Sequence, residues 1–150
     1  MKNPRQSEIV AFFSLLALFT GIIGSGCEPE ELSRQAGGKC EAGSAQIAIW
    51  DGFLQRVCGC GGTDGEIFTP PTPLTCTFKL GQTVVVNYQG PVLTHQIIPV
   101  GSPGIPEGPL YDPNSSNRIY SHAFTLTATG NYLFKDQFNS NLTGSFIVTP

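Results

Sequence analysis

The chain has 150 residues, of which 40% are hydrophobic and 13% are charged, and its formal net charge is −3. Six basic and ten acidic residues follow position 26, and they include no Lys/Arg run, so a nucleic-acid partner is not expected. The roughly 124 residues after that position are enough for one domain with a buried core.

Residues 1–26 have the pattern of a secretory signal peptide. Lys2 and Arg5 precede an uncharged apolar run at 9–23, and Gly-Ser-Gly then leads to Cys27. Small residues before a cysteine resemble the bacterial lipobox, in which that cysteine is lipidated, although Gly24 stands where the lipobox usually has Leu. We therefore expect a bacterial cell-envelope protein that is anchored in membrane lipid through Cys27 and faces the periplasm or the exterior. The alternative is an uncleaved membrane anchor, because the uncharged stretch reaches the lower limit for a span of about 18 residues.

Residues 27–44 are polar and glycine-rich, which predicts a tether between the membrane and a domain at 45–150. If Cys27 carries lipid, four cysteines remain: Cys40, Cys58, Cys60 and Cys76. An even number outside the cytoplasm predicts two disulfides, and disulfide geometry disfavours a bond between Cys58 and Cys60. Cys58 and Cys60 should then pair separately with Cys40 and Cys76, in either combination. A metal–thiolate site is the alternative, but the CGC spacing is not that of common zinc sites.

The rest of the chain alternates short apolar segments with Gly/Pro turns and shows no amphipathic helix. Predicted strands lie at 46–50, 74–80, 83–88, 95–100, 123–127, 132–135 and 145–149, and Gly101–Arg118 reads as one long loop. Short strands at such intervals indicate an all-β antiparallel sandwich or barrel.

Three segments carry a resemblance to a known family. FKLGQTVVVNYQGPVLTHQIIPVG, YSHAFTLTATGNYLF and GSFIVTP resemble, in order and spacing, the later strands of cupredoxins, the plastocyanin-like copper proteins. The resemblance covers about 45–150 and implies a cupredoxin-like Greek-key β-sandwich. In that family an earlier His and a late C-x-x-H-x-x-M-x-G loop hold copper between two imidazoles, a thiolate and a weak thioether.

The copper ligands of that pattern are largely replaced in this chain. His95 matches the first His, but Asp136 falls where the Cys belongs, Asn139 where the second His belongs and Leu142 where the Met belongs. Because no Cys follows Cys76, a blue-copper site of the usual kind is not expected. Asp136 and Asn139 are instead expected to hold the loop by bonding backbone groups.

A different metal site is the competing interpretation. His95, His122 and Asp136 are the candidate metal ligands, and together they could hold copper(II) or zinc. The other reading gives His95 a hydrogen-bonding role at a strand start and leaves His122 on the surface. No hydrolase motif, P-loop or dinucleotide fingerprint is present in the sequence, so no catalytic residue is assigned and no enzymatic activity is expected.

The sequence therefore predicts a membrane-anchored, non-enzymatic module for binding or structure at the cell envelope, with no cofactor. A protein partner is expected to contact the loop Gly101–Arg118, since loops on a rigid sandwich carry function. The main alternative is copper binding or electron transfer at a non-standard site anchored by His95. A further alternative is a subunit of a redox assembly whose metal lies in the partner.

Overall fold

A computed structural model describes residues 40–90 and 92–150 of the chain, all of which belong to one compact unit. The predicted signal segment 1–26, Cys27 and most of the predicted tether lie outside the described residues. Among the residues that are described, there is no helix long and apolar enough to cross a membrane.

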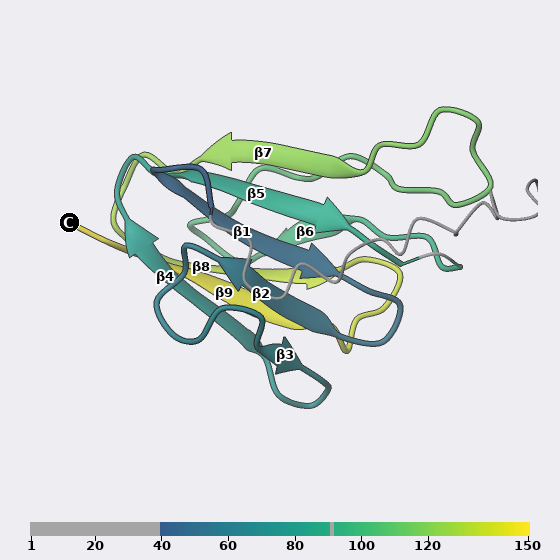
Figure 1. Cartoon of the computed structure of the whole chain (residues 1–150), viewed down its shortest axis with the longest axis horizontal. Helices are drawn as coiled ribbons and strands as arrows, with labels where there is room; N and C mark the ends of the chain where they lie inside the picture. The colour runs from purple at the N-terminus through teal and green to yellow at the C-terminus, as the bar shows by residue number, and fades with distance from the viewer. Residues whose placement is uncertain (1–39, 91) are drawn as a thin grey trace, which may run out of the picture. The chain divides into compact units, whose positions relative to one another are not determined.

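The described chain forms two β-sheets that pack face to face (Figure 1). The first sheet has the order β3-β2-β1-β5-β7 and the second has the order β4-β9-β8-β6. The chain passes from one sheet to the other after each strand from β3 to β7. The strands are β1 (Ser44–Ile49), β2 (Leu54–Cys58), β3 (Ile67–Phe68), β4 (Leu74–Lys79), β5 (Thr83–Tyr88), β6 (Ile97–Val100), β7 (Ser121–Thr125), β8 (Gly130–Asp136) and β9 (Thr143–Thr149).

The prediction of an all-β sandwich is confirmed, but the strands are not all antiparallel as predicted, because β1 pairs in parallel with β5 and β4 with β9. The core follows the period-two alternation of the strands. In β5 the side chains of Val84, Val86 and Tyr88 are buried, and in β8 those of Tyr132 and Phe134 are buried. Each fully buried aliphatic or aromatic side chain of this kind stabilises the fold by about 1.5–3 kcal/mol. The seven predicted strands are all present, with ends that differ by two residues at most.

Two strands of the structure, β2 and β3, were not predicted. The burial of β2 alternates through Leu54, Arg56 and Cys58, so a charged residue occupies one of its inward positions. Arg56 is only 7% exposed, and it is paired with Glu66 and with the Thr75 backbone oxygen at 2.6 Å. A pattern search that counts Arg as polar sees no alternation here.

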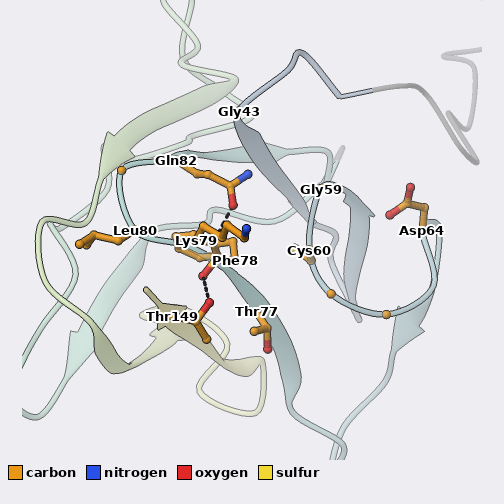
Figure 2. A pocket seen from close by; sticks show the side chains of 13 residues that line it. Gly43, Gly59, Cys60, Asp64, Thr77, Phe78, Lys79, Leu80, Gln82 and Thr149 are labelled. Atoms are coloured by element: carbon orange, nitrogen blue, oxygen red, sulfur yellow. Dashed lines mark hydrogen bonds between the residues drawn. The ribbon is translucent and has the colours of Figure 1, made fainter.

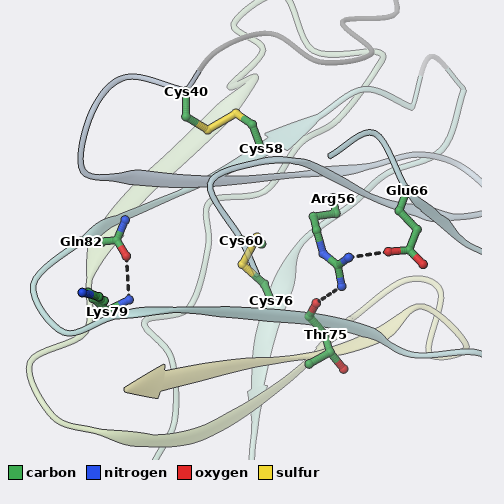
Figure 3. Close-up of a disulfide and its surroundings, with 9 residues drawn as sticks. All are labelled: Cys40, Arg56, Cys58, Cys60, Glu66, Thr75, Cys76, Lys79 and Gln82. Carbon is green, nitrogen blue, oxygen red and sulfur yellow. Dashed lines mark hydrogen bonds and ion pairs between the residues drawn. A yellow bond between two sulfur atoms is a disulfide. The ribbon is translucent and has the colours of Figure 1, made fainter. Parts of the chain in front are cut away.

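Both disulfides predicted from the cysteine count are present in the structure, as Cys40–Cys58 and Cys60–Cys76 (Figure 3). The first bond ties the end of the predicted tether to β2. The second bond ties the turn after β2 to β4, and so joins the two sheets. Within the described residues this resolves the two pairings that the sequence left open.

The loop after β2 covers the free edge of β4. The Arg56 guanidinium donates to the Thr75 oxygen of this strand at 2.6 Å (Figure 3). The Gly61 amide donates to the Thr77 oxygen of the same strand at 2.6 Å. An exposed edge strand offers its unpaired backbone groups to other chains. The Cys60–Cys76 bond therefore holds in place a segment that blocks such pairing.

The loop Gly101–Arg118 lies partly in the core. Ile105 and Tyr111 are 4% and 3% exposed, and a Cβ on Gly108 would overlap the Tyr88 hydroxyl, so the loop packs closely against β5. Leu110, by contrast, is 47% exposed. Only part of the segment that was expected to contact a partner is therefore available at the surface.

Candidate functional site

Asp136 reaches the protein interior because it continues the inward face of β8. Tyr132, Phe134 and Asp136 alternate along the strand and are all buried, and Asp136 is only 1% exposed. Its Oδ1 accepts hydrogen bonds from the backbone amides of Phe138 at 2.9 Å and Gln96 at 3.4 Å. The bond to Phe138 is the local Asx contact that the sequence predicts for this turn.

His95 is completely buried beside Asp136. Its backbone forms a two-bond bridge with Tyr111, with nitrogen-to-oxygen distances of 3.0 and 2.8 Å, just before β6 begins. This bridge fixes the direction of the side chain. The Nδ1 atom of His95 lies 2.5 Å from Oδ2 of Asp136. The structure therefore brings together His95 and Asp136, which the sequence named as candidate ligands.

Asp51 completes the cluster, and sequence reasoning did not identify it. It lies in the turn between β1 and β2, where its Oδ1 is 3.1 Å from His95 Nε2 and accepts the Leu93 amide at 3.0 Å. Its side chain is 27% exposed, so Asp51 is the member of the cluster that contacts solvent. An Asp-Gly pair, as at 51–52, is typical of a turn, but no sequence pattern shows that this turn reaches His95.

Gly90 packs against the Nε2 side of the His95 imidazole, next to Asp51. A Cβ at this position would overlap both Asp51 Oδ1 and His95 Nε2. The backbone of residue 90 therefore occupies the space beside the Nε2–Asp51 contact, and only glycine fits there. We refer below to Asp51, His95 and Asp136 as the Asp–His–Asp cluster.

The electrostatics of the cluster favour a protonated imidazole. Burial by itself would lower the pKa of His95, but hydrogen bonds to Asp136 and Asp51, together with their charges, outweigh it and raise the pKa. Burial raises the pKa of the neighbouring Tyr88 to about 12, and the Asp136 charge adds to this effect. Tyr88 is therefore a neutral neighbour of the cluster at physiological pH.

The other two replaced positions have structural contacts of their own. Asn139 donates from Nδ2 to the Asp51 backbone oxygen at 3.3 Å, and Leu142 is 1% exposed within the core. The Asp136 amide donates to the Leu142 oxygen at 2.9 Å, which closes the loop. The loop between β8 and β9 is thus held by hydrogen bonds and packing.

His122 makes no contact with Asp51, His95 or Asp136 among the interactions of the described residues. It lies on β7 opposite Val86 of β5, and its ring is 5.2 Å from that of Phe124. Its Nε2 is buried and has no hydrogen-bond partner, and burial lowers its pKa. The second predicted imidazole therefore packs beside an aromatic ring and takes no part in the Asp–His–Asp cluster.

The described residues do not fit a blue-copper centre. All four of their cysteines are in disulfides, and Leu142 has no donor atom. The Asp136 carboxylate contacts Nδ1 of His95 and the Asp51 carboxylate contacts Nε2. Each ring nitrogen that could bind a metal ion therefore already faces a carboxylate. Across positions 40–90 and 92–150, no group of three or more His, Cys, Asp or Glu side chains is arranged to hold a metal ion.

A second candidate region is an open, glycine-rich groove of about 900 Å³ beside the disulfides (Figure 2). Its charged side chains are Lys79 and Asp64, and its walls are largely backbone from the 59–62 loop and the turn between β4 and β5. Gln82 Oε1 accepts the Lys79 amide at 2.6 Å, which fixes that turn. Cys60 lies in the lining but is oxidised, so the groove presents no thiol.

No protein-family model matches the sequence, and no curated protein matches it significantly. Among solved structures, the chain is similar to a purple cupredoxin from Nitrosopumilus maritimus, at 21% sequence identity and a TM-score of 0.46, over 70% of this chain and 99% of that one. It is also similar to a variant of amicyanin in its reduced Cu(I) form, at 15% identity and a TM-score of 0.45, over 74% of this chain and 87% of that one. An oxidised amicyanin variant gives 15% identity and a TM-score of 0.46 over the same shares. In the described residues the chain is an all-β sandwich of two sheets, which is the architecture that the resemblance implied.

Proposed function

We propose that this chain is a cell-envelope module that uses a cupredoxin-like sandwich without a blue-copper site. It acts by binding a partner or as a structural component, and it catalyses no reaction. Lipid on Cys27 anchors it in a bacterial membrane, with the domain in the periplasm or outside the cell. The observation that carries the proposal is the Asp136 carboxylate, which contacts Nδ1 of His95 where the resemblance calls for a copper thiolate.

The two disulfides support a location outside the cytoplasm. Disulfides persist in oxidising compartments and are rare where thiols are kept reduced. Both bonds lie between residues 40 and 76 and join β2 and its loop to their surroundings. An oxidising compartment also agrees with the signal pattern at 1–26.

Exposed apolar side chains support a binding role for the loops. Leu110, Ile119 and Tyr120 are 47%, 42% and 55% exposed, and they lie in or directly after the loop that was expected to contact a partner. Large exposed apolar side chains that gather in one region mark interaction sites more often than scattered ones do. We propose that this exposed part of the loop makes the partner contact.

Metal titration of residues 28–150 tests the proposal. We expect neither copper(II) nor zinc to bind with one-to-one stoichiometry, and we expect no intense visible band or blue-copper resonance signal on addition of copper(II). Tight binding that His95→Ala abolishes would instead support the alternative, a copper or electron-transfer protein with a non-standard site. His122→Ala is the matched control, because His122 is the only other histidine of the chain.

A variant with restored ligands provides the positive control. The combined changes Asp136→Cys, Asn139→His and Leu142→Met supply the thiolate, imidazole and thioether that the loop lacks, at unchanged loop length. A thiolate and two imidazoles form the trigonal copper site of the family. We expect this variant to bind copper(II) and give an intense blue band, which would also verify the alignment of the loop on the family pattern.

A further inference from the structure

We propose that His95 is a fixed imidazolium cation that joins three loops by binding Asp51 and Asp136 at once, in place of a metal ion. The inference deepens the proposed function and rests on it, because it assigns a role to the residues that replace the copper site. The observation behind it is that both ring nitrogens of one buried histidine face carboxylate oxygens.

With both carboxylates ionised, the two contacts require two ring protons. An ionised carboxylate only accepts hydrogen bonds, and a neutral imidazole carries a single N–H. Nδ1 lies 2.5 Å from Asp136 and Nε2 lies 3.1 Å from Asp51. Both contacts are hydrogen bonds to carboxylates only when both nitrogens of His95 donate, which is the imidazolium form.

The surroundings supply no competing positive charge. The groups that face the ring are Asp51 from the β1–β2 turn, Asp136 from β8, and Tyr111, whose ring centroid lies 6.2 Å from that of His95. Tyr88 of β5 stacks on Tyr111 at 5.9 Å and is neutral. In the described residues, no Lys or Arg forms an ion pair with either carboxylate, so the imidazolium is their common counter-ion.

The cluster connects segments that are distant in the sequence. Asp51 also accepts from Leu93, and Asp136 also accepts from Phe138, so the segments at 50–53, 92–96 and 137–142 meet at His95. Asp51 follows β1 of one sheet and Asp136 ends β8 of the other. A single cation therefore ties the two sheets together at this end of the sandwich, as a metal ion shared between loops would.

A metal bound by the same three residues is a weaker reading of the geometry. Each carboxylate is within hydrogen-bond distance of a different ring nitrogen, and Gly90 fills the space beside the Nε2–Asp51 contact. Because the imidazole ring lies between the two carboxylates, a metal ion that contacted both of them would either lack a ring nitrogen as a ligand or displace the ring. The proton is the cation that fits the observed distances without rearrangement.

Nitrogen NMR of the imidazole tests the inference on the full chain, purified oxidised in detergent and labelled with ¹⁵N-histidine. The chain has two histidines, so His122→Phe leaves His95 as the only labelled ring. At about pH 7.5, one unit above the ordinary histidine pKa of about 6.5, we expect both ring nitrogens of His95 to carry protons. A ring nitrogen without a proton at that pH would overturn the inference.

Two carboxylate variants test the cause of the protonation. Asp136→Asn removes the charge at Nδ1 and keeps the side-chain shape, so we expect His95 to carry one ring proton at the same pH. If that variant does not fold, Asp51→Asn makes the same test at Nε2 from a partly exposed turn. Asp64→Asn, at an exposed loop position, is the matched control and should leave both protons in place. If His95 keeps both ring protons in the folded Asp136→Asn or Asp51→Asn variant, the inference is contradicted.

The inference and the proposed function can fail separately. Tight copper binding by the wild-type chain would refute the metal-free module, whatever the protonation of His95. Absence of metal binding together with a neutral His95 would leave the module in place and remove the imidazolium from it. Absence of metal binding together with a doubly protonated ring is the result that we expect.

Discussion

Replacing Asp136 by Asn should destabilise the domain, because it removes one partner of a buried ion pair. Breaking such a pair from one side costs about 3–5 kcal/mol, since the remaining charge is left in the interior. Two features place this variant at the lower end of that range. The Asn oxygen can still accept the Phe138 and Gln96 amides, and His95 can release its proton instead of remaining charged. We therefore expect a loss of about 3 kcal/mol in the free energy of unfolding.

Urea denaturation of residues 35–150 at neutral pH measures this loss as a lower midpoint at an unchanged slope, which indicates an unchanged native compactness. The control is Asp64→Asn, an equal change in charge at an exposed position, which should stay within about 0.5 kcal/mol of wild type. If Asp136→Asn proves as mild as the control, the Asp–His–Asp cluster does not stabilise the fold and the reasoning is refuted.

Three further predictions concern pH, the disulfides and the anchor. Because the pKa of His95 is raised in the fold, its contribution to stability is complete below about pH 6.5 and is lost as the pH rises through the folded pKa. Because burial lowers the pKa of His122, stability also falls as the pH drops below about 6.5. Urea midpoints should therefore peak near that pH, and His122→Phe should flatten the profile only on its acidic side. Urea midpoints that rise steadily above pH 6.5 would contradict the assignment to His95. Replacing Cys60 and Cys76 together by Ser opens a link with a sequence separation of 16 and should cost about 3 kcal/mol in chemical denaturation under oxidising conditions, so an unchanged midpoint would be the contrary result. Cys27→Ser, expressed in a bacterial host, should move the chain from the membrane to the soluble fraction and abolish incorporation of labelled palmitate; continued incorporation would place the lipid elsewhere.

The sequence could predict β4 and β5 because their buried faces are made of apolar side chains. Val84 and Val86 show this in β5, whose bounds are identical to the prediction. β2 could not be found in this way, because Arg56 lies on its buried face and is neutralised by partners from β4 and the following loop. A charged residue can be recognised as buried only when its partner is known, and the partner depends on tertiary structure.

The sequence predicted two of the three residues of the Asp–His–Asp cluster and missed the third. The family pattern placed His95 and Asp136 in one site, and they are in contact. Asp51 was missed because its contact with His95 spans 44 positions and joins a turn to a loop, where no sequence periodicity applies. His122 was proposed as a ligand on the basis of its residue type, whereas its direction is set by the pairing of β7 with β5.

Anomalous diffraction at the copper edge, from crystals of the domain grown with copper(II), distinguishes a metal-free module from a copper protein. We expect density for Asp136 in hydrogen-bond contact with His95 and no anomalous peak at coordination distance from the ring. A strong copper peak on a ring nitrogen of His95, with Asp136 or Asp51 turned toward the metal, would contradict this expectation and make this protein a copper protein with a ligand set of its own.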